Sequence, residues 1–192
     1  MLSRLKSYCT KKHRHTESSS DEVDWTALGR AMHSLEPRLQ RWTAKHTVGM
    51  CGVGKFRVLW KFDTDGSCPR CQSCPMEDYL HVLRCRGPTA VAEWTKRHRA
   101  LRDWMIANQT APEIETFLFE YLKTVRTPSL GVPSVRIRSH HPSLFKEAIR
   151  SQASMGSQML LEGLLSREWC RLQELHYIRL GSLRSVRLWA SR

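Results

Sequence analysis

A cluster of cysteines near the middle of the chain carries the clearest chemical signal. Residues 68 to 85 read CPRCQSCPMEDYLHVLRC, with two residues between Cys68 and Cys71 and three between His81 and Cys85. Two residues between thiolates allow a tight turn that aims both sulfurs at one ion. We expect a short helix from Met76 to Cys85, on which residues four apart share a face. The spacing therefore predicts that Cys68, Cys71, His81 and Cys85 bind one metal ion.

The ligand types indicate a structural zinc site. Three thiolates and one imidazole complete a tetrahedral Zn²⁺ shell and leave no open position for a catalytic water. Cys74 extends the first pair to Cys-x2-Cys-x2-Cys and could supply a different ligand. We prefer His81, because three sulfurs within seven residues would be crowded. Unligated thiols and a redox Cys-x-x-Cys pair are the alternatives, although no βαβ pattern surrounds the cluster.

The charge of the chain indicates a polyanionic partner. The 192 residues include 31 Lys and Arg against 18 Asp and Glu, for a formal net charge of +13. Such charge attracts phosphate, so nucleic acid is the expected partner, although a solvated basic surface has the same composition. Trp60 or Tyr79 could stack on an unpaired base, but we expect both to be buried. The candidate phosphate contacts are Lys55, Arg57, Lys61, Arg70, Arg84, Arg86, Lys96, Arg97 and Arg99.

Other features argue for an intracellular protein, nuclear or cytoplasmic. No run of about 18 apolar residues marks a membrane span, and the first 22 residues lack the apolar stretch of a secretory signal. The seven cysteines, crowded in the centre, fit metal binding in a reducing compartment better than a disulfide framework. The first 16 residues are basic and free of acid, which also permits organellar targeting.

We find no motif that predicts an enzyme. The segment GMCGVGKF, residues 49–56, matches a phosphate-binding loop except that Phe56 replaces the Ser or Thr that holds Mg²⁺. A nuclease would need clustered carboxylates near a lysine. The nearest set is explained by helix capping and a solvated face; it comprises Glu113, Glu115, Glu120 and Lys123.

Apolar periodicity predicts a mainly α fold with a small central zinc knuckle. Asp24 fits the N-cap of a helix that starts at Trp25, and Pro37 fits the first turn of a second helix. Helical spacing also predicts a helix near 89–107, on which His98 lies on the apolar face and is expected to be a core histidine.

The later part of the chain is expected to be helical as well. Thr110 and Glu113 match a capping box before the most regular apolar pattern in the sequence. A long final helix is expected to start at Ser143 and to pass through Gly156 and Gly163, which would let another helix approach closely.

The segment FRVLWKF, residues 56–62, has no clear assignment from its pattern. Apolar and basic residues alternate as in a strand, but seven residues do not decide between strand and helix. In either case we expect its aromatic side chains to pack against the flanking helices.

Composition divides the chain into four regions. Residues 1–22 have few apolar anchors and are expected to form a disordered tail. Residues 23–126 form a helical region that contains the knuckle at 66–87, the proline-rich residues 127–142 form a linker, and residues 143–192 form a C-terminal helical block.

The central residues also resemble a known family. The segments HTVGMCGVGKFRVLWKF, CPRC and EDYLHVLRC, followed by Trp94, are similar to the C-terminal region of LINE-type, non-LTR retrotransposon polyproteins, most specifically over residues 42 to 105. That region, downstream of the reverse transcriptase, has a Thr-Gly-rich turn, a basic-aromatic segment and a Cys-Cys-His-Cys zinc knuckle. The family's metal ligands fall on the four residues that the spacing selects, and its acid before the histidine falls on Glu77 or Asp78.

This chain departs from the family pattern in three ways. Val48 separates Thr47 from Gly49 in the turn, Cys74 is an extra thiol, and the Tyr/Phe-x-Asp-Asp motif of a reverse transcriptase is absent. The resemblance therefore implies a non-catalytic module that binds structural zinc and nucleic acid, either RNA or DNA. The alternative is a protein-interaction or structural remnant with no nucleic-acid role, and a nuclease ranks below both.

Overall fold

The computed structural model describes residue 7, residues 21–127 and residues 142–181. This part of the chain is mainly helical, as predicted, and it has no β-strand; its one pairing of extended backbone is an antiparallel bridge between Val23 and Ser166. Most of the predicted tail and of the predicted linker lies outside these residues. The helices are α3 (Trp25–Ser34), α4 (Pro37–Thr47), α5 (Gly54–Leu59), α6 (Tyr79–Arg84), α7 (Pro88–Ala107), α8 (Pro112–Arg126), α9 (Ser143–Met155), α10 (Ser157–Leu161) and α11 (Arg167–Arg179).

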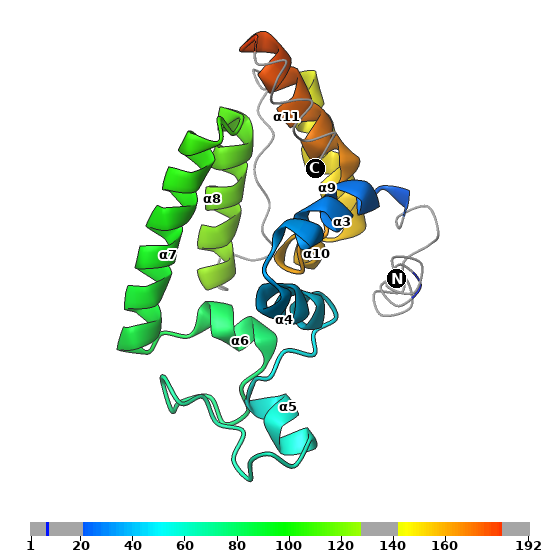
Figure 1. Cartoon of the computed structure of the whole chain (residues 1–192). Coiled ribbons are helices and arrows are strands. Elements are labelled where there is room, and N and C mark those ends of the chain that lie inside the picture. The colour runs from blue at the N-terminus through cyan, green and yellow to red at the C-terminus, as the bar shows by residue number, and fades with distance from the viewer. Residues whose placement is uncertain (1–6, 8–20, 128–141, 182–192) are drawn as a thin grey trace.

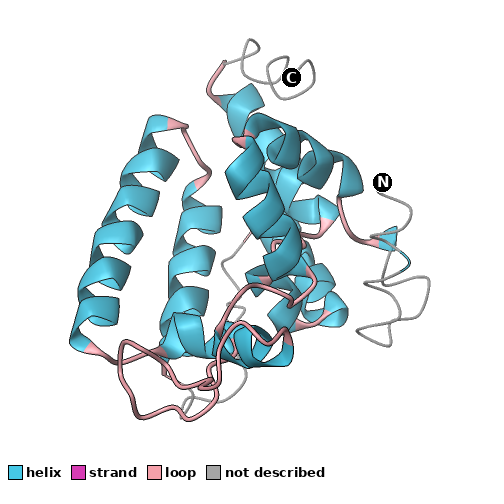
Figure 2. Cartoon of the chain, turned by 60° about the horizontal axis from the view of Figure 1, so that its bottom comes forward, coloured by secondary structure: helices cyan, strands magenta, loops and turns pink. Residues whose placement is uncertain are grey.

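The helices form two packed groups with the knuckle at one end. The antiparallel pair α7 and α8 lies along one side, and α9 packs along α11 on the other (Figure 1). Helix α6 lies at the end of α8, and α5 projects beyond it on long loops, which Figure 2 shows gathered at the same end. None of the helices described has the length and apolar character needed to span a bilayer.

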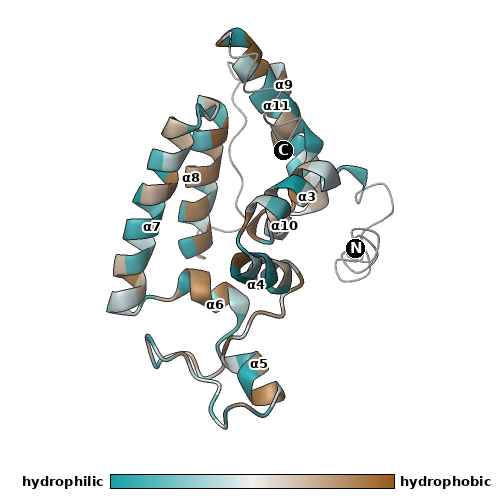
Figure 3. Cartoon of the chain, viewed as in Figure 1, coloured by the Kyte–Doolittle hydropathy of each residue, from teal (hydrophilic) through white to brown (hydrophobic). Residues whose placement is uncertain are grey.

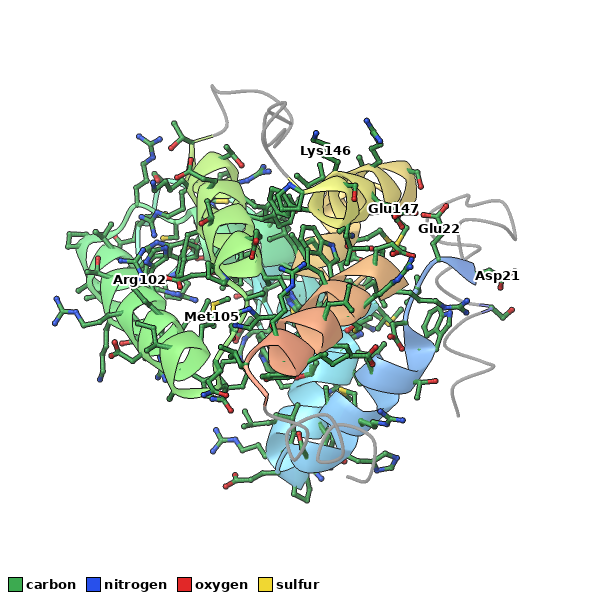
Figure 4. All side chains as sticks on the ribbon, turned by 90° about the horizontal axis from the view of Figure 1, so that it is seen from above. Asp21, Glu22, Arg102, Met105, Lys146 and Glu147 are labelled. Carbon is green, nitrogen blue, oxygen red and sulfur yellow. The ribbon has the colours of Figure 1, made fainter. Side chains whose placement is uncertain are left out.

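Local signals correctly predict how the first helices start. The Oδ1 atom of Asp24 accepts a hydrogen bond from the Ala27 N–H at 2.8 Å, so Asp24 is the N-cap of α3. Helix α4 starts at Pro37, as expected. Just before α3, the carboxylate of Glu22 accepts hydrogen bonds from the hydroxyls of Ser151 and Ser154 on α9 (Figure 4). These bonds tie the start of the described chain to the C-terminal helices.

One hydrophobic core draws on α8, α9 and α11. The rings of Phe117 and Trp169 lie 4.4 Å apart between centroids, and Phe145 packs edge-on against the same indole. The buried amide of Gln152 accepts hydrogen bonds from the Trp169 indole N–H and from the Ser166 N–H. The core thus joins residues on both sides of the predicted linker.

Helix α11 also holds the turn between α7 and α8. The side-chain oxygen of Gln173 accepts a hydrogen bond from the buried Ala111 N–H at 2.9 Å, and its amide N–H donates to the Gln109 carbonyl at 3.0 Å. The hydroxyl of Tyr177 donates to the Asn108 carbonyl at 2.9 Å. These three bonds satisfy backbone N–H and C=O groups that have no hydrogen-bond partner within the turn.

The predicted capping box at Thr110 and Glu113 is wrong. The N-cap of α8 is Ala111, and no side chain caps the helix. In the predicted capping box the Glu113 side chain would bind the Thr110 N–H, but this N–H donates to the Met105 carbonyl at 2.9 Å. The N–H of Ala111, the actual N-cap, is bound by Gln173 of α11.

The predicted long final helix is also wrong, because the chain turns at Gly156. This residue has φ +102°, a left-handed conformation that glycine adopts without strain and that ends α9. A Cβ built there would meet only Met159 Cγ, at 3.9 Å, so the glycine terminates a helix and does not permit close approach. Pro142, not Ser143, is the N-cap of α9.

The segment 56–62 is helical over its first part, and its aromatics do not pack as expected. Residues 54–59 form α5. The expectation that its aromatic side chains pack against the flanking helices is wrong, because Trp60 is 38% exposed and Phe62 is 72% exposed. In Figure 3 the end of α5 stands out as a hydrophobic tip away from the main body.

We predict that replacing Gln173 with alanine destabilises the protein by about 1 to 3 kcal/mol, because the buried Ala111 N–H loses its acceptor. Glu174→Ala is the matched control, since Glu174 is exposed on the same helix. Urea unfolding followed by circular dichroism measures both free energies of unfolding. Equal stability of the two variants would contradict the proposed importance of this contact.

Candidate metal centre

The structure brings the four predicted ligands together. Their ligand atoms all lie within 4.8 Å of one another. The Sγ atoms of Cys68 and Cys85 are 3.7 Å apart, and Cys71 Sγ is 3.4 Å from His81 Nε2. Cys68 and Cys85 are buried, whereas Cys71 and His81 are partly exposed. Residues 68, 71, 81 and 85 therefore form a Cys3His cluster that could hold a metal ion.

Two short hydrogen-bonded units aim the ligands at one point. The Gln72 N–H donates to the Cys68 carbonyl at 2.9 Å and closes the turn between the first two cysteines. Asp78 caps α6 by accepting from the His81 N–H, and the Cys85 N–H donates to the His81 carbonyl at the other end. Because Asp78 sets its start, α6 is shorter than the predicted helix, but it still places His81 and Cys85 on one side.

Cys74 is not one of the clustered ligands. Its Sγ lies 3.4 Å from the Met76 carbonyl and donates a hydrogen bond to it. Its own carbonyl accepts from the Cys68 N–H at 2.9 Å, so Cys74 supports the knuckle through its backbone. This geometry agrees with the choice of His81 over Cys74 as fourth ligand.

The two cysteines of the first pair have different environments. Burial raises the pKa of the Cys68 thiol to about 11. At Cys71, hydrogen bonds from the side chain and backbone of Ser73 lower the pKa to about 6. These hydrogen bonds favour the thiolate form of Cys71, which is the ionised form that a metal requires.

Glu77 and Asp78, where the resemblance implies an acid, both have local roles. The backbone N–H of Glu77 donates to the Gly66 carbonyl and its carbonyl accepts from the Lys55 N–H. Its buried carboxylate accepts from the Gly54 N–H at 3.3 Å and lies 3.9 Å from the guanidinium of Arg70. Glu77 therefore joins the start of α5 to the knuckle, while Asp78 caps α6.

The knuckle has no apolar core of its own. Between residues 54 and 87 the buried residues are three glycines, two cysteines and one glutamate, and no aliphatic or aromatic side chain of this segment is buried. Gly87 packs so closely that an added Cβ would overlap the Arg70 carbonyl and lie 2.7 Å from its carbon atom. Backbone contacts, a few polar side chains such as Glu77 and Asp78, and the thiol cluster hold these loops.

Helix α6 links the knuckle to the helical body. The hydroxyl of Tyr79 donates to the carboxylate of Glu162 at 3.2 Å, and Arg84 Nε donates to the Val125 carbonyl at 3.2 Å. From α4, the ring Nε2–H of His46 donates to the Leu161 carbonyl at 2.9 Å, and the Thr47 hydroxyl donates to that of Glu162. The position of the ligands is thus tied to the segment between α10 and α11.

All nine predicted phosphate contacts are exposed, but four of them have partners within the protein. Arg57 pairs with Asp63, Arg70 with Glu77 and Arg97 with Glu93, and Arg84 binds a backbone carbonyl. The other five are exposed lysines and arginines, namely Lys55, Lys61, Arg86, Lys96 and Arg99.

The two segments that partly match enzyme motifs do not have the structural surroundings that those motifs require. Residues 49–56 follow helix α4, whereas a phosphate-binding loop follows a strand. On α8, Glu120 pairs with Lys123 at 2.7 Å, and Glu115 pairs at 3.3 Å with Arg102 of α7, which is labelled in Figure 4.

An apolar cavity of about 310 Å³ was not predicted from the sequence. It lies between the α7–α8 pair and α11, and residues that line it include Trp104, Met105, Phe117 and Tyr177. Cys170 also borders it, and burial raises the pKa of this thiol to about 12, so it stays protonated at neutral pH. No sequence signal indicates the cavity, because its walls come from separate helices.

No protein family, no curated protein and no solved structure matches this chain. Fold and site together define its class: a mainly helical protein with a Cys3His cluster that could bind a metal ion.

We predict that Gly87→Ala lowers metal affinity about tenfold or more, because the added methyl group pushes the Arg70 carbonyl and with it the turn that carries Cys71. Gly52→Ala is the control, since a Cβ there meets nothing within 4 Å. Competition with a chromogenic chelator measures both affinities. Unchanged affinity in Gly87→Ala would show that the turn tolerates displacement.

Proposed function

We propose that this chain is a non-catalytic module that binds one structural Zn²⁺ and, through its basic surface, nucleic acid. The observation that carries the proposal is the convergence of three thiols and an imidazole in a segment without buried aliphatic or aromatic side chains. The proposed origin is the C-terminal region of a LINE-type retrotransposon polyprotein without its polymerase.

The donor set and its surroundings support zinc. Sulfur and imidazole donors in a closed set of four suit tetrahedral Zn²⁺, whose structural sites contribute directly to folding. Segment 54–87 needs such a contribution, because it buries too little apolar surface to order itself. The six cysteines of the described residues are all free, which fits a reducing compartment such as the nucleus or cytoplasm.

Charge and exposure support nucleic acid as the partner. The formal net charge is +13, and all nine candidate phosphate contacts are exposed. Five of them have neither an ion pair nor a side-chain hydrogen bond among the described residues, so their charge is available to phosphate groups. In this proposal zinc holds the knuckle rigid, and the basic side chains around it contact the phosphate backbone.

The zinc part of the proposal predicts about one Zn²⁺ per chain in protein prepared without added zinc. We expect Cys71→Ser to lose the metal, because it removes a ligand, and Cys74→Ser to keep it, because that thiol faces the Met76 carbonyl. Mass spectrometry of metal content measures all three proteins. Zinc well below one per chain in the wild type, with no loss of fold on chelation, would contradict the proposal.

The nucleic-acid part predicts affinity that falls steeply with salt. We expect the double variant Lys96→Glu, Arg99→Glu to weaken binding and to reduce the log–log salt slope by about 0.7 to 0.9 for each phosphate that it no longer neutralises. The control is Arg150→Glu, Arg179→Glu, which makes the same charge change on α9 and α11. Fluorescence anisotropy with labelled RNA and DNA measures both slopes.

Two outcomes would count against nucleic-acid binding. Equal weakening in the two double variants would show a diffuse charge effect and no defined interface. Absence of wild-type binding at low salt would favour a protein-interaction or structural remnant.

A further inference from the structure

The exposed end of α5 carries a row of aromatic rings that the fold does not use. The ring centroids of Phe56 and Trp60 are 5.3 Å apart, and those of Trp60 and Phe62 are 6.3 Å apart at an interplanar angle of 73°. Leu59 and Phe62 are 66% and 72% exposed. We call Phe56, Leu59, Trp60, Lys61 and Phe62 the α5 surface. Large apolar side chains gathered in this way on a surface mark a binding site.

The backbone holds this surface in a defined conformation. The Lys61 N–H donates to the Val58 carbonyl at 2.9 Å, and the Phe62 N–H donates to the Arg57 carbonyl at 2.8 Å. These two bonds form the Schellman ending of a helix, in which the next-to-last residue is left-handed. The backbone of Phe62 is therefore fixed although its ring is exposed, so ligand binding would restrict only the side chain.

Lys61 occupies the left-handed position, where glycine is usual. Its φ of +60° costs conformational energy in any residue with a Cβ. A lysine here lowers stability relative to glycine and adds an exposed positive charge at the position between Trp60 and Phe62 in the sequence. Because Lys61 lowers stability and supplies an exposed charge, its presence at this position points to a role in binding.

Positive charge surrounds the rings. The Nζ atom of Lys45 lies 5.9 Å from the centroid of the Trp60 ring, and Lys55 and Lys61 are exposed at either end of α5. A ligand that matches this pattern has flat apolar faces joined by negative charges. Protein interfaces are depleted in lysine at their centres, so this combination favours a polynucleotide over a protein partner.

We infer that the α5 surface binds single-stranded nucleic acid, with unpaired bases stacked on Phe62 and Trp60 and neighbouring phosphates at Lys61 and Lys45; this inference rests on the proposed nucleic-acid function. A duplex does not fit equally well, because its bases are stacked on one another and present no free faces. The contacts do not read base edges, so binding is tolerant of sequence.

The test compares three ligands of about 15 nucleotides: a single strand, the same strand as a duplex, and a base-free strand of abasic sites. Phe62→Ala is expected to lower affinity for the single strand about tenfold and to change affinity for the abasic strand less than about twofold. Trp104→Ala is the control, because this indole is 56% exposed on α7, away from the α5 surface. Circular dichroism and zinc content verify that each variant is folded.

A second variant separates binding from stability. Lys61→Gly removes the conformational cost of a left-handed backbone at a residue with a Cβ. We therefore expect the melting temperature of this variant to stay equal or rise, while its single-strand affinity falls several-fold. A merely structural role for Lys61 would move stability and leave affinity unchanged.

Each remaining outcome is decisive. If the wild type binds with salt dependence but Phe62→Ala binds as the wild type does, the inference is wrong and the proposed function stands. Equal losses on the abasic and base-containing strands also overturn it, because stacking is then not involved. A wild type that prefers duplex indicates a different occupant of the α5 surface, such as a protein. Absence of wild-type binding to every ligand at low salt overturns both this inference and the proposed nucleic-acid binding.

Discussion

Burial of the thiols of Cys68 and Cys85, with Cys71 and His81 beside them, is the constraint on which the whole knuckle depends. In a hydrophobic core each apolar side chain adds a small, replaceable increment of free energy. In segment 54–87 the buried positions are occupied by cysteine, glycine and glutamate, so no such increments exist to compensate for a missing ligand. The Asp78 cap of α6 and the attachment of α5 through Glu77 add to that cluster in holding the loops.

The rest of the molecule is stabilised in a different way. Phe117, Trp169 and their neighbours form an ordinary hydrophobic core, and buried glutamines satisfy the backbone groups around it. The hydrogen bonds of Tyr79 and His46 to the segment around Glu162 are among the few links between this body and the knuckle. Regions with few buried apolar contacts open at a lower free energy, so we expect the metal-free knuckle to open more readily than the body.

The sequence predicted features whose cause lies within a few residues. Asp24, Pro37 and the Cys3His cluster are such features, since a cap, a first turn and two pairs of clustered residues each depend on local spacing. Most of the wrong predictions concern features that depend on residues far away in the sequence. Gln173 caps a backbone group 62 residues earlier, and the exposure of Phe62 depends on how far α5 stands from the body. Gly156 could have indicated the end of a helix, but the helical periodicity on both sides of it predicted one continuous helix.

The bonds from α11 to the turn at 108–111 also order events during synthesis. Gln173 and Tyr177 lie 62 to 69 residues after the backbone groups that they bind. At typical translation rates the α7–α8 pair waits several seconds for α11, with its turn exposed to solvent. The four residues of the Cys3His cluster, by contrast, span 18 residues and emerge together. A nascent chain can therefore bring these four side chains together well before its hydrophobic core is complete.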